Sequence, residues 1–88
     1  MIWRIEWERR ASDELRRLTA ANPNQAQRIL DALDRLAEQN QGDVKRLEGR
    51  PGEYRLRVGG WRVLFRRDAA AGCVIVARIA PRGRAYRR

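Results

Sequence analysis

The sequence predicts a small α+β domain, in which an N-terminal strand and a two-helix antiparallel hairpin pack on one face of a mostly antiparallel sheet of three to four strands. Three observations indicate this fold class. The first half of the chain has apolar residues at helical spacing, the second half alternates as strands do, and a Gly-Gly pair separates two alternating runs. At 88 residues we expect one domain, residues 1–88, because a chain of this length buries only roughly 60–65% of its unfolded surface.

The first half of the chain predicts a strand followed by two helices. Residues 2–7 alternate between apolar and charged side chains, as in a half-buried strand. A short amphipathic helix follows over about residues 9–18. Asn22 as N-cap and Pro23 at the first helical position then start a longer helix that ends near Gln39. Few residues join the helices, so we expect an antiparallel hairpin lying on the sheet. The apolar side chains of the strand are Trp3, Ile5 and Trp7.

The second half of the chain predicts strands. Residues 54–58 and 61–66 alternate, and Gly59-Gly60 between them predicts a β-hairpin whose two turn residues both favour positive φ. Residues 73–80 are almost continuously apolar, which is typical of a central strand covered on both faces. The tail, residues 82–88, is too basic and too short to form part of the core.

The predicted hairpin register separates an apolar face from a basic one. With glycines in the turn, Arg57 lies opposite Arg62, and directly opposed residues share a face. Like charges opposite one another destabilise a strand pair, so we expect an anion to occupy this face. The basic face collects Arg55, Arg57, Arg62 and Arg66. The apolar face, where the helices should pack, collects Tyr54, Leu56, Val58, Trp61, Val63 and Phe65.

The net charge of +9 comes from the second half of the chain. Residues 1–44 carry seven arginines and eight acidic residues, whereas residues 45–88 carry thirteen basic residues and three acidic ones. Nineteen of the twenty basic residues are arginines, whose planar guanidinium groups match phosphate oxygens two at a time. A polyanion is therefore the first partner to consider.

Composition also bears on metal chemistry and on location. With no histidine and a single cysteine, Cys73, the chain has few metal ligands and no internal disulfide. We therefore expect no metal site and no small-molecule cofactor, and interpret Cys73 as a small buried residue. No apolar run approaches the ~18 residues that span a bilayer, and no signal peptide precedes the first strand. We expect a cytoplasmic protein with no membrane partner.

Three segments, taken in order, resemble the RelE/ParE toxin family of bacterial type II toxin–antitoxin systems. They are residues 44–49 (VKRLEG), 54–62 (YRLRVGGWR) and 79–87 (IAPRGRAYR). The resemblance spans essentially the whole chain and implies the RelE-like fold and a cognate antitoxin protein as partner. Members similar to RelE cleave messenger RNA in the ribosomal A site without a metal, which would make the ribosome and mRNA partners as well. Members of the ParE branch poison DNA gyrase instead.

The RelE branch is the favoured one, and its pattern implies an endoribonuclease site made of side chains alone. The implied reaction is attack of a ribose 2′-hydroxyl on its own 3′-phosphate, in which guanidinium groups orient the phosphate and stabilise its developing charge. The resemblance assigns catalytic roles to Arg55, Arg57, Arg62, Arg82 and Tyr86. RNA-binding roles are expected for Lys45, Arg46, Arg66, Arg84 and Arg87.

One departure from the RelE pattern concerns proton transfer. Proteins similar to RelE have lysines where this chain has Arg55 and Arg57, and an arginine does not act as a base near neutral pH. With no histidine and no well-placed carboxylate in the basic half, Tyr86 is left as the titratable candidate. Tyr86 as a stacking platform, or as a residue that packs the tail, remains an alternative. A ParE-type gyrase inhibitor, or an RNA-binding module without turnover, is the alternative for the whole protein.

Overall fold

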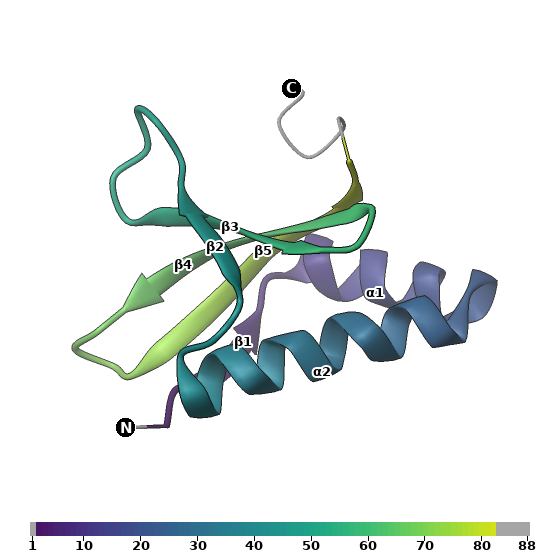
Figure 1. Ribbon diagram of the computed structural model, residues 1–88, viewed down its shortest axis with the longest axis horizontal. Coiled ribbons are helices and arrows are strands. Elements are labelled where there is room, and N and C mark those ends of the chain that lie inside the picture. Colours follow the sequence, from purple (N-terminus) through teal and green to yellow (C-terminus); the bar gives the residue numbers. More distant parts are fainter. Residues whose placement is uncertain (1, 83–88) are drawn as a thin grey trace.

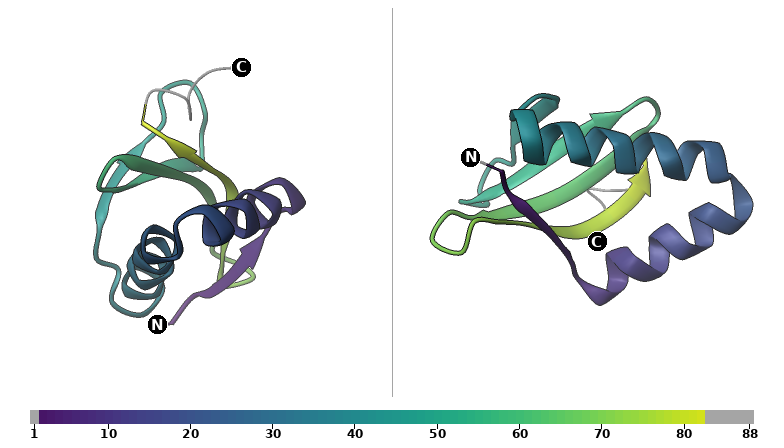
Figure 2. Two further views of the ribbon diagram at one scale, coloured as in Figure 1. Left: turned by 90° about the vertical axis from the view of Figure 1, so that its right-hand side faces the viewer. Right: turned by 90° about the horizontal axis from the view of Figure 1, so that it is seen from below.

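In the computed structural model, which describes residues 2–82, two helices cover one face of a five-stranded sheet (Figure 1). The strand order is β1-β5-β4-β3-β2; β1 pairs in parallel with β5, and the other neighbours are antiparallel. Figure 2 shows both helices on the same side of the sheet. The elements are β1 (Arg4–Trp7), α1 (Arg9–Ala21), α2 (Pro23–Gln39), β2 (Asp43–Arg46), β3 (Glu53–Val58), β4 (Trp61–Asp68) and β5 (Cys73–Pro81).

The α+β class and the order of elements are confirmed, but the sheet has five strands rather than three to four. The strand that the alternation pattern does not reveal is β2. It has only four residues, of which Val44 is the one apolar member, so it carries almost no periodicity of its own. Antiparallel pairing with β3 makes it a strand.

The ends of the helices follow from local side-chain chemistry. The side chain of Asn22 accepts a hydrogen bond of 3.1 Å from the backbone N–H of Gln25, and Pro23 occupies the first turn of α2, as predicted. α1 continues to Ala21, three residues beyond the predicted end, because its last turn runs directly into this cap. Asn40 ends α2 in the left-handed region, with φ of 54°.

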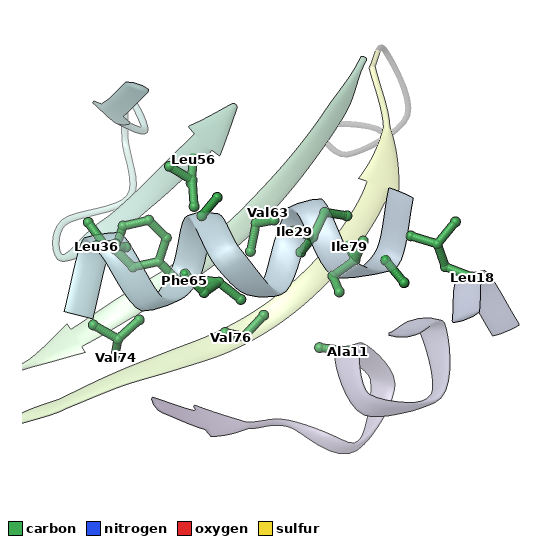
Figure 3. Close-up of a cluster of buried hydrophobic side chains, with 13 residues drawn as sticks. Ala11, Leu18, Ile29, Leu36, Leu56, Val63, Phe65, Val74, Val76 and Ile79 are labelled. Carbon is green, nitrogen blue, oxygen red and sulfur yellow. The ribbon is translucent and has the colours of Figure 1, made fainter. Parts of the chain in front are cut away.

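The core lies between the helices and the inner face of the sheet (Figure 3). Ile29 and Leu36 of α2 contact a layer of fully buried strand side chains that includes Phe65. This arrangement confirms the apolar face predicted for the hairpin. On that face the rings of Tyr54 and Phe65 stack with 5.5 Å between their centroids. The half-buried aromatic and apolar residues around the core include Trp3, Ile5, Trp7 and Trp61.

The hairpin of β3 and β4 has the predicted register. Arg57 lies opposite Arg62, and Val58 opposite Trp61. Of the two turn glycines only Gly59 has a positive φ, +60°, so one position of the turn rather than both requires a glycine-like backbone. Neither helix in the described part of the chain is long and apolar enough to cross a membrane.

Candidate functional site

The sheet face opposite the helices carries a small apolar cluster of its own. Leu64 of β4 and Ala80 of β5 are buried there, and Leu47, the residue after β2, packs on them. In the strand register Leu64 lies opposite Arg55 and Ala80 opposite Arg62. The cluster therefore lies beside two arginines of the basic face.

Beside this cluster lies a pocket of about 590 Å³. Its walls come from β2, from the loop between β2 and β3, and from the middle of the β3–β4 hairpin. Six of its eight lining residues are cationic and one is acidic, so it is an electropositive hollow open to solvent. The lining residues are Lys45, Arg46, Leu47, Glu48, Arg50, Arg55, Arg57 and Arg62.

Two arginines of the pocket are buried to an extent that is rare for this residue type. Arg55 is 8% exposed and Arg62 is 5% exposed. Nη1 of Arg55 and Nε of Arg62 are buried and have no hydrogen-bond partner within residues 2–82. A buried charged donor without an acceptor is costly. The positive charge that a ligand can reach comes from the exposed cations of the lining, among them Arg46 and Arg57, with the two buried arginines behind them, and it favours a ligand with anionic oxygens.

The acidic side chain nearest these donors is Asp43, at the start of β2. Its carboxylate lies 3.6 Å from Nη1 of Arg55 and 3.8 Å from Nε of Arg57, which are ion-pair rather than hydrogen-bond distances. Asp43, which precedes the basic half of the sequence, pairs with two arginines of the basic face, and Glu48 lines the pocket, so two carboxylates that the sequence argument did not consider lie near the basic cluster. Antiparallel pairing of residues 43–46 with β3 is the signal that would have placed Asp43 opposite Arg57.

The remaining sequence-predicted residues divide into three groups. Lys45 and Arg46 line the pocket with the hairpin arginines, whereas Arg66 does not, because its guanidinium pairs with Glu8 at the start of α1. Arg82 is exposed just after β5, and its backbone N–H donates to the carbonyl of Gly60 at 2.8 Å. Arg84, Tyr86 and Arg87 lie outside the described residues.

Arg50, a pocket residue that sequence reasoning missed, lies in the loop before β3.

A separate polar group surrounds Cys73 at the start of β5. Arg4 donates to the sulfur of Cys73 at 2.9 Å and to the carboxylate of Glu6 at 3.1 Å. Burial raises the pKa of the Cys73 thiol, and its contact with Glu6 raises it further, so the thiol stays protonated near neutral pH. Its burial, as predicted, and its protonation make Cys73 a structural residue rather than a nucleophile.

Comparison with known proteins gives one family match over nearly the whole chain. Residues 5–86 match the family described as ParE toxin of type II toxin-antitoxin system, parDE. The chain belongs to the ParE toxin family. Among curated protein sequences no significant match was found.

Solved structures place this toxin in the wider RelE/ParE group. It is similar to the archaeal RelE–RelB complex from Pyrococcus horikoshii, with 27% identity, a TM-score of 0.74, and coverage of 96% of this chain and 99% of that chain. The RelBE2 toxin-antitoxin complex of Mycobacterium tuberculosis matches with 22% identity and a TM-score of 0.77, over 93% and 100% of the chains. A mutant of E. coli RelE in the free state has the same identity and TM-score, over 98% and 88%.

The toxin's pocket has the parts needed to hold a phosphate group. Three of its guanidinium groups, those of Arg55, Arg57 and Arg62, come from two adjacent strands, so the strand pairing fixes their backbone positions. In the described part of the chain, no three Cys, Asp or Glu side chains gather closely enough to bind a metal ion. What the pocket itself supplies is oriented positive charge, with Asp43 and Glu48 as nearby carboxylates.

Proposed function

We propose that this toxin is an endoribonuclease that cleaves messenger RNA on the ribosome, and so inhibits translation, without a metal ion. The observation that carries the proposal is the electropositive pocket itself, in which six of the eight lining residues are cationic, with Arg57 exposed and Arg55 and Arg62 buried in its wall. A phosphodiester supplies anionic oxygens that the accessible guanidinium groups of this pocket can bind.

In the proposed reaction a ribose 2′-oxygen attacks the adjacent phosphorus. The bond from phosphorus to the 2′-oxygen forms, the bond to the 5′-oxygen of the next nucleotide breaks, and the products are a 2′,3′-cyclic phosphate and a free 5′-hydroxyl. The hydroxyl proton leaves to a base and the departing 5′-oxygen takes up a proton. We assign the stabilisation of the phosphoryl oxygens to Arg55, Arg57 and Arg62. Arg82 and Tyr86 are proposed to complete the site, with Tyr86 in proton transfer.

We propose a cognate antitoxin as the regulatory partner. The P. horikoshii relative is a RelE–RelB complex, and the M. tuberculosis relative is described as a toxin-antitoxin complex. An acidic or amphipathic antitoxin that covers the pocket would supply carboxylates to its exposed basic residues. With the ribosome and mRNA as the other partners, the site of action is the cytoplasm.

The test of the proposed function is controlled expression of the toxin followed by primer extension on a translated message. Cleavage of the message and arrest of translation are expected for the unchanged protein. Arg62→Ala and Arg82→Ala should relieve toxicity while the protein remains folded by circular dichroism. Arg17→Ala, which removes an exposed arginine of α1, is the matched control and should remain toxic. Full toxicity of the Arg62 and Arg82 variants would rule the cleavage proposal out.

Inhibition of DNA gyrase is the second candidate, and the match to the ParE toxin family is the observation that favours it. Under that function, induced cells should filament and induce the response to DNA damage, while message ends stay intact. Purified gyrase should lose supercoiling activity in the presence of the toxin. If expression of the protein is harmless and its binding to RNA weakens steeply with salt, the protein is instead an RNA-binding module that has lost catalytic activity.

A further inference from the structure

The strand β5 contains a bulge that changes which side chains it presents to the basic face. Val76 pairs with the core residue Phe65, whereas Arg78 pairs with Leu64 on the opposite face of the sheet, so Ala77 between them has no partner on β4. One extra residue in a strand exchanges its two faces from that point on. The bulge therefore places Arg78 on the face that carries the arginine pocket, where regular alternation from Val76 would have sent it to the core.

Arg78 lies at one end of a row of residues that crosses four strands. In the strand register Lys45 lies opposite Arg55, Arg55 opposite Leu64, and Leu64 opposite Arg78. Because neighbouring strands are about 4.8 Å apart, the backbone of Arg78 lies about 10 Å from that of Arg55. Lys45 and Arg55 line the pocket, and Arg78 is not one of its lining residues. The positive charge of this face therefore continues past the pocket onto β5.

The guanidinium of Arg78 is held in place by α1. β1 covers the edge of β5 only as far as Val76. Beyond it, Glu14 of α1 accepts hydrogen bonds from the backbone N–H of Ile79 at 2.8 Å and from Nε of Arg78 at 3.1 Å. The Arg78 side chain keeps 19% of its surface exposed, and its two terminal nitrogens donate to no acceptor within residues 2–82. Glu14 thus fixes the plane of the guanidinium through Nε and leaves the other donors for a ligand.

The charge around Arg78 is positive in spite of Glu14. The Glu14 carboxylate also lies 3.8 Å from Nε of Arg10, so one acidic group serves two arginines. Arg82, just after the end of β5, adds an exposed cation further along the same strand. A guanidinium with parallel donors free matches two oxygens of a phosphate at once. This end of the row is therefore suited to a phosphate group separate from the one in the pocket.

We propose that Arg78 is a second phosphate contact, and that single-stranded RNA with one phosphate in the arginine pocket runs across the sheet toward β5 and places a neighbouring phosphate on Arg78. Glu14 is the residue that positions this contact. The inference rests on the proposed function in one respect, namely that the pocket holds an RNA phosphate. It adds the direction in which the RNA strand lies on the toxin, and a binding residue that the sequence pattern did not single out.

The test compares a short and a long RNA probe. They are the 2′-O-methyl dinucleotide of adenosine, which has a single phosphate, and the corresponding hexanucleotide; neither can be cleaved, because each 2′-oxygen is methylated. Dissociation constants are measured over a series of salt concentrations for the unchanged toxin, for Arg78→Gln and for Arg17→Gln. Arg17 is an exposed arginine of α1 outside the pocket lining, so Arg17→Gln removes the same charge elsewhere.

Arg78→Gln should weaken binding of the hexanucleotide about tenfold at low salt, as for loss of a charged hydrogen bond. It should also lower the slope of log affinity against log salt by about 0.7, the value for one phosphate contact with a single strand. Binding of the dinucleotide should change less than twofold, because its phosphate occupies the pocket. Arg17→Gln should leave both probes within twofold. The inference is overturned if Arg78→Gln leaves the hexanucleotide unaffected, or weakens both probes equally.

A second measurement uses the unchanged toxin, since Arg78→Gln also removes a partner of Glu14. The Nε–H resonance of Arg78, identified as the one missing from the spectrum of the variant, should shift with the hexanucleotide and not with the dinucleotide. No shift at saturation would refute the contact. If Arg78 responds as expected but no message is cleaved, the nuclease proposal is lost and the path of the RNA stands. If message is cleaved and Arg78 does not respond, only the path is lost. If neither probe binds, the path and the phosphate pocket fail together.

Discussion

Arg57 and Arg62 lie directly opposite each other on β3 and β4, on the face of the sheet that the helices leave uncovered. Two like charges at such a pair destabilise the ladder. Arg62 is 5% exposed and so cannot turn away into water, whereas Arg57 is partly exposed and reaches toward Asp43. The sheet thus holds a guanidinium in a position that costs stability, which indicates that the position is kept for function.

The first prediction separates that functional role from stability. Arg62→Met replaces a buried, incompletely paired cation with an apolar side chain of similar length. The midpoint of thermal unfolding should stay the same or rise by a few degrees, because the cost of the buried charge is removed. RNA cleavage in a ribosome assay should fall by about 10²–10³-fold, as for loss of one aligned donor to the phosphoryl oxygens. A variant that is both active and destabilised would contradict the role given to Arg62.

The second prediction concerns Glu14 of α1, whose side chain is 13% exposed. Its carboxylate accepts 2.8 Å and 3.1 Å hydrogen bonds from the backbone N–H of Ile79 and from Nε of Arg78. Glu14→Ala leaves both donors without this acceptor and should lower the free energy of unfolding by about 1–3 kcal/mol in urea titrations. Glu38→Ala, an exposed change on α2, should stay within about 0.5 kcal/mol of the unchanged protein.

The third prediction compares two adjacent arginines of β4. The guanidinium carbon of Arg67 lies 5.1 Å from the ring centroid of Tyr54 and 5.7 Å from that of Phe65, whereas Arg66 makes an exposed ion pair with Glu8. Arg67→Ala should cost about 0.5–2 kcal/mol of stability, and Arg66→Ala about 0–1 kcal/mol. Thermal unfolding of both variants provides the measurement, and equal losses would argue against a stabilising stack.

The fourth prediction uses the raised pKa of the Cys73 thiol. Since burial favours the neutral thiol, alkylation by iodoacetamide at pH 8 should be much slower for folded toxin than for toxin in urea. A folded-state pKa above the unfolded value also means that this contribution to stability is complete below the unfolded pKa of about 8.5 and is lost as pH rises toward the folded one. Unfolding titrations of Cys73→Ala should lack that alkaline loss. Equal alkylation rates in the two states would show that the thiol is exposed.

Local signals predicted much of the fold. The Asn22-Pro23 helix start, the alternation of the hairpin and the Gly-Gly turn each depend on residues within a few positions of one another, and each element formed where the pattern placed it. The sequence pattern did not predict the strand β2, because four residues with one apolar side chain show no periodicity. Only its antiparallel pairing with the next strand, β3, defines it.

The candidate site was predicted less completely, for a related reason. The pocket arginines of the hairpin could be grouped from register alone, but the partners of charged side chains depend on tertiary contacts. Arg66 pairs with Glu8, the residue between β1 and α1, and Asp43 reaches two arginines because β2 pairs with β3. No spacing rule in the sequence encodes either contact.

The parallel pairing of β1 with β5 has a consequence for synthesis. The edge strand β1 (Arg4–Trp7) is synthesised first, but it pairs with residues 73–76. Nearly the entire chain must therefore emerge from the ribosome before the sheet can form completely. Contacts this far apart along the chain close late. A translation product interrupted before β5 lacks the strand that joins β1 to the rest of the sheet, so the complete toxin fold can form only after synthesis has passed that point.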